Sequence, residues 1–196
     1  MTIRLATEAD AGAIAAIYAP ACESSAISFE SSAPAPAEMA QRIGTITRQF
    51  PWLVLDDAEN VAGYAYSSAH RERAAYGWST DVSVYVSPAY FRRGVGRALY
   101  TALLPILGLQ GYHNVYAGIT LPNPASVGLH EAVGFRPLVV YRRVGFKLGA
   151  WHDVAWYELD LQPRRSAPPP PRPVTALMDS PEWADALQAG LKRYRR

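Results

Sequence analysis

The sequence predicts a mixed α/β domain in which helices pack on both faces of one β-sheet. Strand-like and helix-like segments alternate along the first 161 residues, which is typical of layered α/β folds. At the centre, a β-branched and aromatic segment at residues 78–86 is followed by a glycine-rich turn and an amphipathic segment at residues 94–108. The chain has 196 residues, 49% of them hydrophobic, so it can bury a sizeable core.

Composition restricts the class of protein. The sequence has no apolar run as long as a membrane span, and its first residues lack the apolar region of a signal peptide. Cys22 is the only cysteine, so no internal disulfide is possible and we expect a cytoplasmic location. The net charge of +2 is unevenly distributed: twelve Lys and Arg accompany fourteen Asp and Glu through Gln162, whereas the remainder has seven against three.

This change in composition predicts a boundary near Gln162. Residues 1–162 would form the main domain, and the proline-rich residues 163–179 a stiff, extended linker. Residues 180–196 predict a short helix with Ser180 as its N-cap and a basic end. We expect this helix to dock on its own domain or a dimer mate, or to be partly disordered. A basic anchor for nucleic acid or a partner protein is the alternative.

The other elements follow from periodicity and from turn residues, in chain order. Residues 2–6 predict a strand, and Thr7 is a good N-cap for the helix that follows it. The Ser-, Ala- and Pro-rich residues 24–36 predict a loop, and residues 70–77 a polar loop. The remaining predictions are a helix at 36–50, strands at 52–55 and 61–67 joined by a hairpin turn at 56–60, a strand at 115–120, a helix at 123–133, and strands at 135–144 and 154–161.

Gly94 and Gly96 stand in the first turn of the predicted helix at residues 94–108. The N–H groups of a first turn have no partner inside the helix, and an anion can approach them closely where side chains are missing. A pyrophosphate is the ligand we expect. The motif is neither a P-loop, since no Gly-Lys-Ser/Thr follows, nor a dinucleotide fingerprint, since the third glycine is missing. A tight turn without a ligand is the alternative.

The predicted helix at residues 123–133 carries a histidine. Asn123 is a good N-cap, and at about 100° per residue Ser126 and His130 fall with it on one polar face. The opposite face, expected to pack on the sheet, consists of Ala125, Leu129, Ala132 and Val133. His130 can transfer a proton near neutral pH, and a surface histidine without a role is the alternative.

Asp81 is an acid within the apolar central strand and shares one sheet face with Ser83 and Tyr85. A carboxylate at such a position needs a partner or access to water. The residues leave two interpretations open. One is an ion pair with Arg71 or Arg73, and the other is a general base at a cleft.

Several motifs follow one another in an order that resembles a known family. They are Ile3-Arg4, Ala9-Asp10, Ile17-Tyr18, Gly63-Tyr64-Ala65-Tyr66, Ser83-Val84-Tyr85-Val86, Arg93-Gly94-Val95-Gly96-Arg97-Ala98-Leu99, Leu121-Pro122-Asn123, Leu129-His130-Glu131-Ala132-Val133-Gly134-Phe135, Gly145-Phe146-Lys147 and Trp151-His152-Asp153. Over about residues 2–161, the chain resembles the GCN5-related N-acetyltransferases (GNAT). It is most similar to the branch that contains phosphinothricin and methionine sulfoximine acetyltransferases.

This resemblance implies the acyl-CoA N-acyltransferase fold, with one mixed, mostly antiparallel sheet that is splayed beside its central strand. It implies acetyl-CoA as co-substrate and no metal ion. The pantetheine arm would pair with the central strand, the pyrophosphate would bind the N–H groups of the glycine turn, and a backbone N–H near Val86 would polarise the acetyl carbonyl. The implied cofactor-binding residues are Val84, Tyr85, Val86, Arg92, Arg93, Gly94, Val95, Gly96, Arg97, Asn123 and Ser126.

The implied reaction is direct transfer, in which an amine loses a proton, attacks the thioester and releases the CoA thiolate. Asp81 and His130 match the acid–base pair of the branch: Asp81 would draw the amine proton and His130 would protonate the thiolate. Two positions depart from the family pattern. Asp81 replaces a glutamate that is one methylene longer, which favours a water relay, and Phe91 replaces the Gln or Arg that begins the phosphate motif, which should weaken cofactor binding.

The acceptor is less closely defined. The resemblance implies that Phe29, Glu30, Arg71, Arg73 and Tyr76 bind it. An arginine fork suits a carboxylate or phosphinate, although solvated loop charges are the alternative for both arginines. We expect a small amino-acid-like amine, with a polyamine, a protein N-terminus or a non-catalytic CoA-binding module as alternatives. Relatives pair their last strands across a dimer, so we also expect a homodimer.

Overall fold

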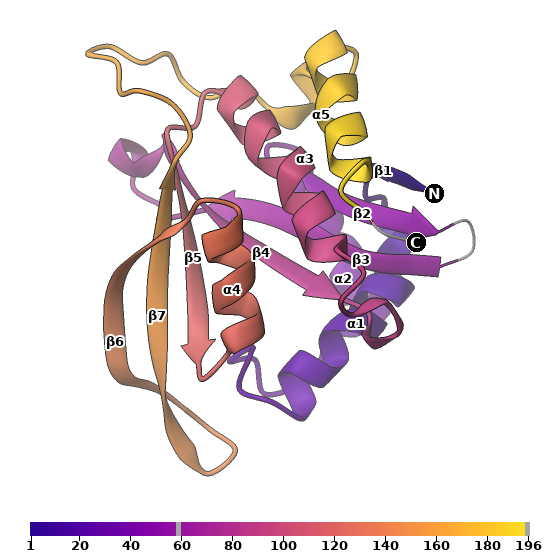
Figure 1. Ribbon diagram of the computed structural model, residues 1–196, viewed down its shortest axis with the longest axis vertical. Helices are drawn as coiled ribbons and strands as arrows, with labels where there is room; N and C mark the ends of the chain where they lie inside the picture. The colour runs from indigo at the N-terminus through magenta and orange to yellow at the C-terminus, as the bar shows by residue number, and fades with distance from the viewer. Residues whose placement is uncertain (58–59, 195–196) are drawn as a thin grey trace.

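A sheet in the order β1-β2-β3-β4-β5-β7-β6 is the centre of the computed structural model, which describes residues 1–57 and 60–194 (Figure 1). Its strands are β1 (Thr2–Leu5), β2 (Trp52–Asp57), β3 (Asn60–Ala69), β4 (Ser79–Val86), β5 (Asn114–Leu121), β6 (Arg136–Lys147) and β7 (Ala150–Asp160). The helices are α1 (Ala11–Glu23), α2 (Pro36–Ile46), α3 (Val95–Gln110), α4 (Pro124–Ala132) and α5 (Pro181–Leu191). Short 3-10 segments are η1 (Glu8–Asp10), η2 (Ala74–Tyr76), η3 (Pro88–Tyr90) and η4 (Val174–Ala176). The mixed α/β class is confirmed.

The sheet opens beside its central strand. Neighbouring strands are antiparallel except β4 and β5, which are parallel. Their pairing extends only from Ser79 opposite Asn114 to Asp81 opposite Tyr116, although both strands continue well beyond these residues. The predicted splay is therefore confirmed, and it begins immediately after Asp81.

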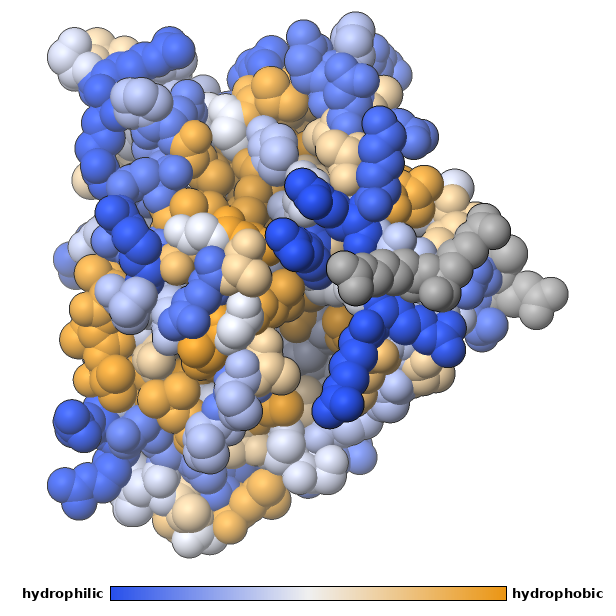
Figure 2. Space-filling model, viewed as in Figure 1, coloured by the Kyte–Doolittle hydropathy of each residue, from blue (hydrophilic) through white to orange (hydrophobic). Residues whose placement is uncertain are grey.

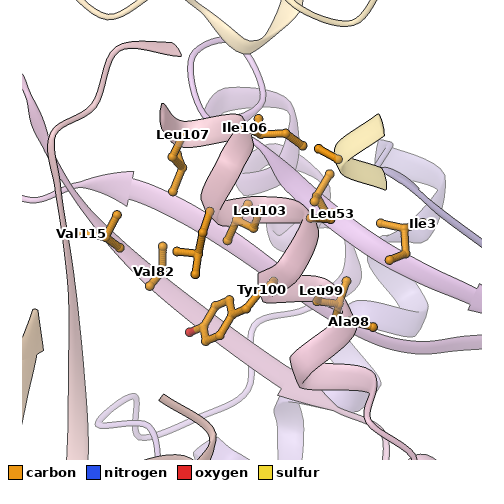
Figure 3. Packing of buried hydrophobic residues seen from close by; sticks show 14 of the residues in the cluster. Ile3, Leu53, Val82, Ala98, Leu99, Tyr100, Leu103, Ile106, Leu107 and Val115 are labelled. Carbon is orange, nitrogen blue, oxygen red and sulfur yellow. The ribbon is translucent and has the colours of Figure 1, made fainter. Parts of the chain in front are cut away.

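Two hydrophobic cores lie on the two faces of the sheet. α3 and α5 cover the face towards the viewer in Figure 1, and α1 and α2 cover the other face. Alternating residues of β2 serve both cores: Leu53 packs with α3, whereas Trp52 packs with α1 and α2. Figure 3 shows Leu99 and Leu103 of α3 among the side chains of the first core.

Local signals placed most element ends correctly. Gly94 precedes α3 and Asn123 caps α4 by accepting a hydrogen bond from the N–H of Ser126 (3.1 Å). The predicted helix at residues 36–50 was too long, since it ends at Ile46 and the Thr47 hydroxyl donates to the Ile43 carbonyl at that end (2.7 Å). The last strand begins at residue 150 rather than 154, because it pairs with β6 from the hairpin turn onward. Residues 58–59 of the predicted hairpin turn lie outside the described residues.

The C-terminal segment packs on the same chain. Trp183 and Ala186 of α5 belong to the core that α3 forms, and Gly190 lies so close to α3 that an added Cβ would be 2.6 Å from the Ala98 carbonyl oxygen. The preceding segment is also held, since the Trp78 indole donates to the Pro169 carbonyl (2.8 Å). α5 is therefore a helix that packs on its own chain, and the core extends past the predicted boundary at Gln162. Residues 195–196 of the basic end lie outside the described residues.

Among the described helices, none is both long and apolar enough to cross a membrane.

Candidate active site

A cleft of about 580 Å³ runs between α1, the second half of β4 and the first turns of α3 and α4. All but one of the predicted cofactor-binding residues line it, namely Val84, Tyr85, Val86, Arg92, Gly94, Val95, Gly96, Arg97, Asn123 and Ser126. The exception is Arg93, whose guanidinium lies over the ring of Tyr90 (5.4 Å to the ring centroid). The splay and the glycine turn therefore form parts of one channel.

The turn before α3 is shaped to hold an anion. Arg92 (φ 62°) and Gly94 (φ 79°) both adopt the left-handed conformation, which directs the chain sharply into the helix. The first intrahelical hydrogen bond is donated by Ala98 to the Gly94 carbonyl (2.9 Å), so the N–H groups of the preceding helical residues are free to bind a ligand. Arg92 and Arg97 add positive charge at this end of the cleft. The turn thus fits a pyrophosphate.

Gly96 has a packing role that the sequence did not reveal. A Cβ at this position would approach the Leu129 side chain of α4 to 2.8 Å. The absent side chain therefore lets α4 pack closely against the first turn of α3, where Gly96 and Leu129 both line the cleft. Phe91 is exposed and lines the same cleft. The first position of the phosphate motif therefore carries an aromatic ring in place of the Gln or Arg of the family pattern.

A smaller cavity of about 50 Å³ lies in the splay between β4 and β5. Ser83 from β4, Tyr100 from α3 and His130 from α4 line it, and it shares Asn123 and Ser126 with the larger cleft. A group delivered along the cleft into the splay would therefore meet the His130 imidazole.

His130 is buried, which excludes the alternative of a surface histidine, and the face that it was predicted to share with Asn123 and Ser126 lines the small cavity. His130 is only 4% exposed, whereas Ala125 and Ala132, which were expected to pack on the sheet, are exposed. Its Nδ1 lies 2.8 Å from the Ser126 carbonyl oxygen and its Nε2 lies 3.0 Å from the Tyr100 hydroxyl. Burial is possible because both nitrogens have partners.

The same contacts define the proton positions of His130. A carbonyl oxygen can only accept a hydrogen bond, so Nδ1 carries the proton and Nε2 accepts from the Tyr100 hydroxyl. Burial lowers the pKa of His130, although its hydrogen bond to Ser126 opposes this effect. The imidazole is therefore neutral near pH 7, and Nε2 can receive a proton when the Tyr100 hydroxyl rotates to accept a hydrogen bond instead of donating one.

Asp81 is paired, but not with either predicted arginine. Its Oδ1 lies 2.6 Å from Nδ1 of His70, a residue that sequence reasoning did not select. Arg71 instead donates to the His70 carbonyl (2.8 Å) and extends over the Trp156 ring. Burial raises the pKa of the Asp81 carboxyl, while the hydrogen bond from His70 partly offsets that rise.

The register of the β3–β4 hairpin could have identified His70. Ser68 pairs with Asp81 and Ala69 with Thr80, so residue 70 is in the diagonal position next to Asp81. Diagonal neighbours on one face are within reach of long side chains. The sequence did not reveal this contact because it does not fix the register.

Asp81 and His130 are not brought into one cavity. Among the described residues that line the small cavity, His130 is present and Asp81 is not. Ser83, two residues beyond Asp81 on the same strand face, is part of its lining. The two predicted acid–base groups therefore have separate partners, His70 for Asp81 and Tyr100 and Ser126 for His130.

The predicted acceptor residues separate into two groups. Glu30 accepts hydrogen bonds from both guanidinium nitrogens of Arg42 (2.8 and 3.0 Å) and from the Tyr18 hydroxyl (3.1 Å), and Arg42 lowers the pKa of Glu30. Phe29 packs against Gly145 of β6, where an added Cβ would overlap its ring. These contacts hold the loop after α1 against α2 and against the β6–β7 hairpin.

The second group surrounds His70. Tyr76 makes an edge contact with the imidazole (ring centroids 5.9 Å apart), and Arg73 is exposed in the same loop. Tyr76 is therefore accessible beside the imidazole that pairs with Asp81. Within residues 1–57 and 60–194, no three His, Cys, Asp or Glu side chains are placed to hold a metal ion.

Comparisons with known proteins agree with this geometry. Residues 3–156 match the family model described as an acetyltransferase (GNAT) domain. The chain is 40% identical over 172 residues to phosphinothricin N-acetyltransferase of Streptomyces viridochromogenes, covering 88% of this chain and 92% of that protein. It is 33% identical over 162 residues to L-methionine sulfoximine/L-methionine sulfone acetyltransferase of Salmonella typhimurium, covering 82% and 95%.

The fold is also similar to that of solved structures. The crystal structure of a phosphinothricin acetyltransferase from Sinorhizobium meliloti in complex with AcCoA matches with a TM-score of 0.81 and 36% sequence identity. The match covers 86% of this chain and 92% of that one.

Proposed function

Because this chain belongs to the GNAT acetyltransferase family, we propose that it transfers the acetyl group of acetyl-CoA to the amine of a small amino-acid-like acceptor of the phosphinothricin or methionine sulfoximine type. The observation that carries the proposal is the single cleft that joins the anion-binding turn of α3 to the splay beside β4. Such a channel would hold a phosphate at one end and a thioester at the other.

The cofactor-binding roles follow from the cleft. The N–H groups at the start of α3, with Arg92 and Arg97, would hold the pyrophosphate. The unpaired edge of β4 at Val84, Tyr85 and Val86 would hydrogen-bond the pantetheine arm, because β5 has separated from β4 there. A backbone N–H of this edge would also polarise the acetyl carbonyl. Arg93, directed at Tyr90, would contribute through its backbone only.

Two protons must leave an ammonium acceptor before an amide is formed. Asp81, on the sheet face beside the loop with Arg73 and Tyr76, would direct removal of the first proton and leave a neutral amine. After attack on the thioester carbonyl carbon, the neutral His130 would receive the second proton at Nε2 and pass it to the departing sulfur. The products are an N-acetyl acceptor, free CoA thiol and one proton released to solvent.

The acceptor would be held from two sides. Arg73 and Tyr76 are exposed in the loop that follows His70, and an exposed guanidinium suits the carboxylate or phosphinate of such an acceptor. Arg71 would add charge near its position over Trp156. Phe29 and Glu30 would shape the opposite wall, with Glu30 acting through its ion pair with Arg42.

We include a homodimer and a cytoplasmic location in the proposal. Figure 2 shows apolar residues gathered along the β6–β7 hairpin, at the left of the view. The exposed large apolar side chains of this hairpin are Leu138, Val139, Val140, Tyr141, Val144, Phe146, Leu148 and Trp151. A second copy would cover this patch. The cytoplasmic location stays a prediction from the single cysteine.

Thiol release from acetyl-CoA over a panel of amines tests the function. The panel contains phosphinothricin, methionine sulfoximine, neutral and basic amino acids, a polyamine and a peptide N-terminus. We expect turnover with the first two, and selective loss of these acceptors in Arg73→Ala. Glu72→Ala, which removes an exposed charge from the same loop, is the matched control. Calorimetric binding of acetyl-CoA without turnover of any amine would favour a CoA-binding module instead.

A further inference from the structure

We propose that His70 is the catalytic base that receives the first amine proton, with the Asp81 carboxylate orienting its imidazole. This inference rests on the proposed transferase function and assigns a residue that neither the sequence nor the family resemblance selected. It is carried by the 2.6 Å contact between Nδ1 of His70 and Oδ1 of Asp81.

An ionised Asp81 carboxylate has no proton to donate, which sets the direction of the hydrogen bond. The carboxylate accepts, so Nδ1 of His70 carries the proton and Nε2 has its lone pair available. Asp81 and His70 thus form a His–Asp dyad. The Asp81 carboxylate selects the tautomer of the His70 imidazole and stabilises the imidazolium that forms when His70 takes up a proton. The same arrangement explains the shorter acid: Asp81 does not need to reach the amine when the imidazole extends its reach.

The surroundings of His70 support this role. Its ring stacks on Tyr116 of β5 (centroids 4.5 Å apart) and makes edge contacts with Tyr76 of η2 and Trp156 of β7. These three rings fix the orientation of the imidazole through ring contacts, and they do not form hydrogen bonds to its Nε2. His70 therefore lies at the wall formed by the loop with Arg73 and Tyr76, where we place the acceptor.

The proton transfer is balanced. An N–H bond of the acceptor's ammonium breaks, and an N–H bond forms at Nε2 of His70. The product pair is a neutral amine and an imidazolium hydrogen-bonded to the Asp81 carboxylate. The titratable groups that face this imidazole are Asp81 from β4, Tyr76 from η2 and Tyr116 from β5, while Arg71 lies over the neighbouring Trp156 ring.

The decisive variant is His70→Asn, whose amide can still donate to Asp81 but has no nitrogen lone pair to accept a proton. We expect kcat/KM to fall at least about 10²-fold, with the Kd for acetyl-CoA unchanged in calorimetry. In a plot of kcat/KM against pH, the fall in rate at acidic pH should disappear in His70→Asn. His70→Ala should regain part of its rate with added imidazole, and the His70→Ala/Asp81→Asn double variant should not. Glu72→Ala in the same loop should behave as wild type.

Two results would overturn the assignment. The first is a wild-type kcat/KM in His70→Asn. The second is a lower rate in His70→Asn with the acid limb of its pH profile intact, together with no rescue of His70→Ala by imidazole. The second result would indicate a structural role for His70. If the wild-type enzyme turns over no amine, the transferase proposal fails, and the imidazole is still tested by its ¹⁵N NMR spectrum in the full chain. The Nδ1–H tautomer at neutral pH supports the pair, and the Nε2–H tautomer excludes it.

Discussion

Asp10 and Asp81 are two carboxylates of the same sheet domain in opposite electrostatic environments. Asp10 ends η1 and accepts two hydrogen bonds from the guanidinium of Arg4 (2.8 and 2.7 Å) and one from the Thr7 N–H (2.8 Å). Asp81 has instead one imidazole partner, His70. Arg4 lowers the pKa of Asp10, whereas burial raises the pKa of Asp81.

The difference separates a structural acid from one available for chemistry. A permanent cation and a helix start hold Asp10 ionised, so its charge stabilises the fold and has no proton to exchange near neutral pH. The partner of Asp81 can itself gain and lose a proton. A partly buried carboxyl with a titratable partner beside a cleft is the arrangement expected of an acid–base site.

The largest effect should come from Asp81→Asn. We expect kcat/KM to fall by about 10²- to 10⁴-fold, since the amide cannot orient His70 correctly or accept a proton. The free energy of unfolding should stay the same or rise, because a desolvated charge is removed. Steady-state thiol release and urea unfolding of the same preparation measure both quantities. If Asp81→Asn instead lost stability and kept normal turnover, Asp81 would be a structural acid like Asp10.

Asp10→Asn should show the opposite profile. We expect the free energy of unfolding to fall by about 2 kcal/mol, because the capping box at Thr7 and a charge-assisted pair are both lost. Arg4 is partly exposed, so solvent screening limits how much its ion pair with Asp10 contributes to this loss of stability. The kcat/KM should stay within twofold of wild type. Glu23→Gln, at the exposed end of α1, is the control and should change stability by less than about 0.5 kcal/mol.

The pH dependence of stability should sharpen the contrast. The pKa of Asp10 is lowered from its ordinary value of 3.8, so its contribution is complete above that value and is lost as the pH falls through its folded pKa. The pKa of Asp81 is raised, so its ionisation destabilises the fold as the pH rises from 3.8 through its folded pKa. Unfolding from pH 2 to 7 should show a shallower acid loss in Asp10→Asn, and a relative gain at neutral pH in Asp81→Asn.

Glu30→Gln should have the smallest effect on stability, at most about 1 kcal/mol. Its ion pair with Arg42 is more than one-third exposed on both sides, and such pairs contribute little. Because this pair positions the loop that carries Phe29, we expect the acceptor KM to rise while the Kd for acetyl-CoA stays unchanged. An unchanged acceptor KM would remove this loop from the acceptor site.

Local rules accounted for the cofactor side of the site. The strand before Pro88, the glycine at the start of α3 and the Asn123 cap depend on residues close together in the chain, and all three occur as predicted. The acid–base side was predicted less well. The burial of His130 depends on Tyr100, thirty residues away in another helix, and periodicity on α4 alone placed Ala125 and Ala132 against the sheet, where they are exposed.

By itself, the sequence determined the element order, the phosphate-binding turn and the family, because these are set by short motifs and by the conformational limits of Gly, Pro and Asn. Only the tertiary structure decided at which residue β4 separates from β5, that His130 is neutral and buried against Tyr100, and that His70 contacts Asp81. Each of these features depends on strand register or on contacts between distant segments. They are stabilised by packing between segments that are distant in the chain, which no local sequence pattern specifies.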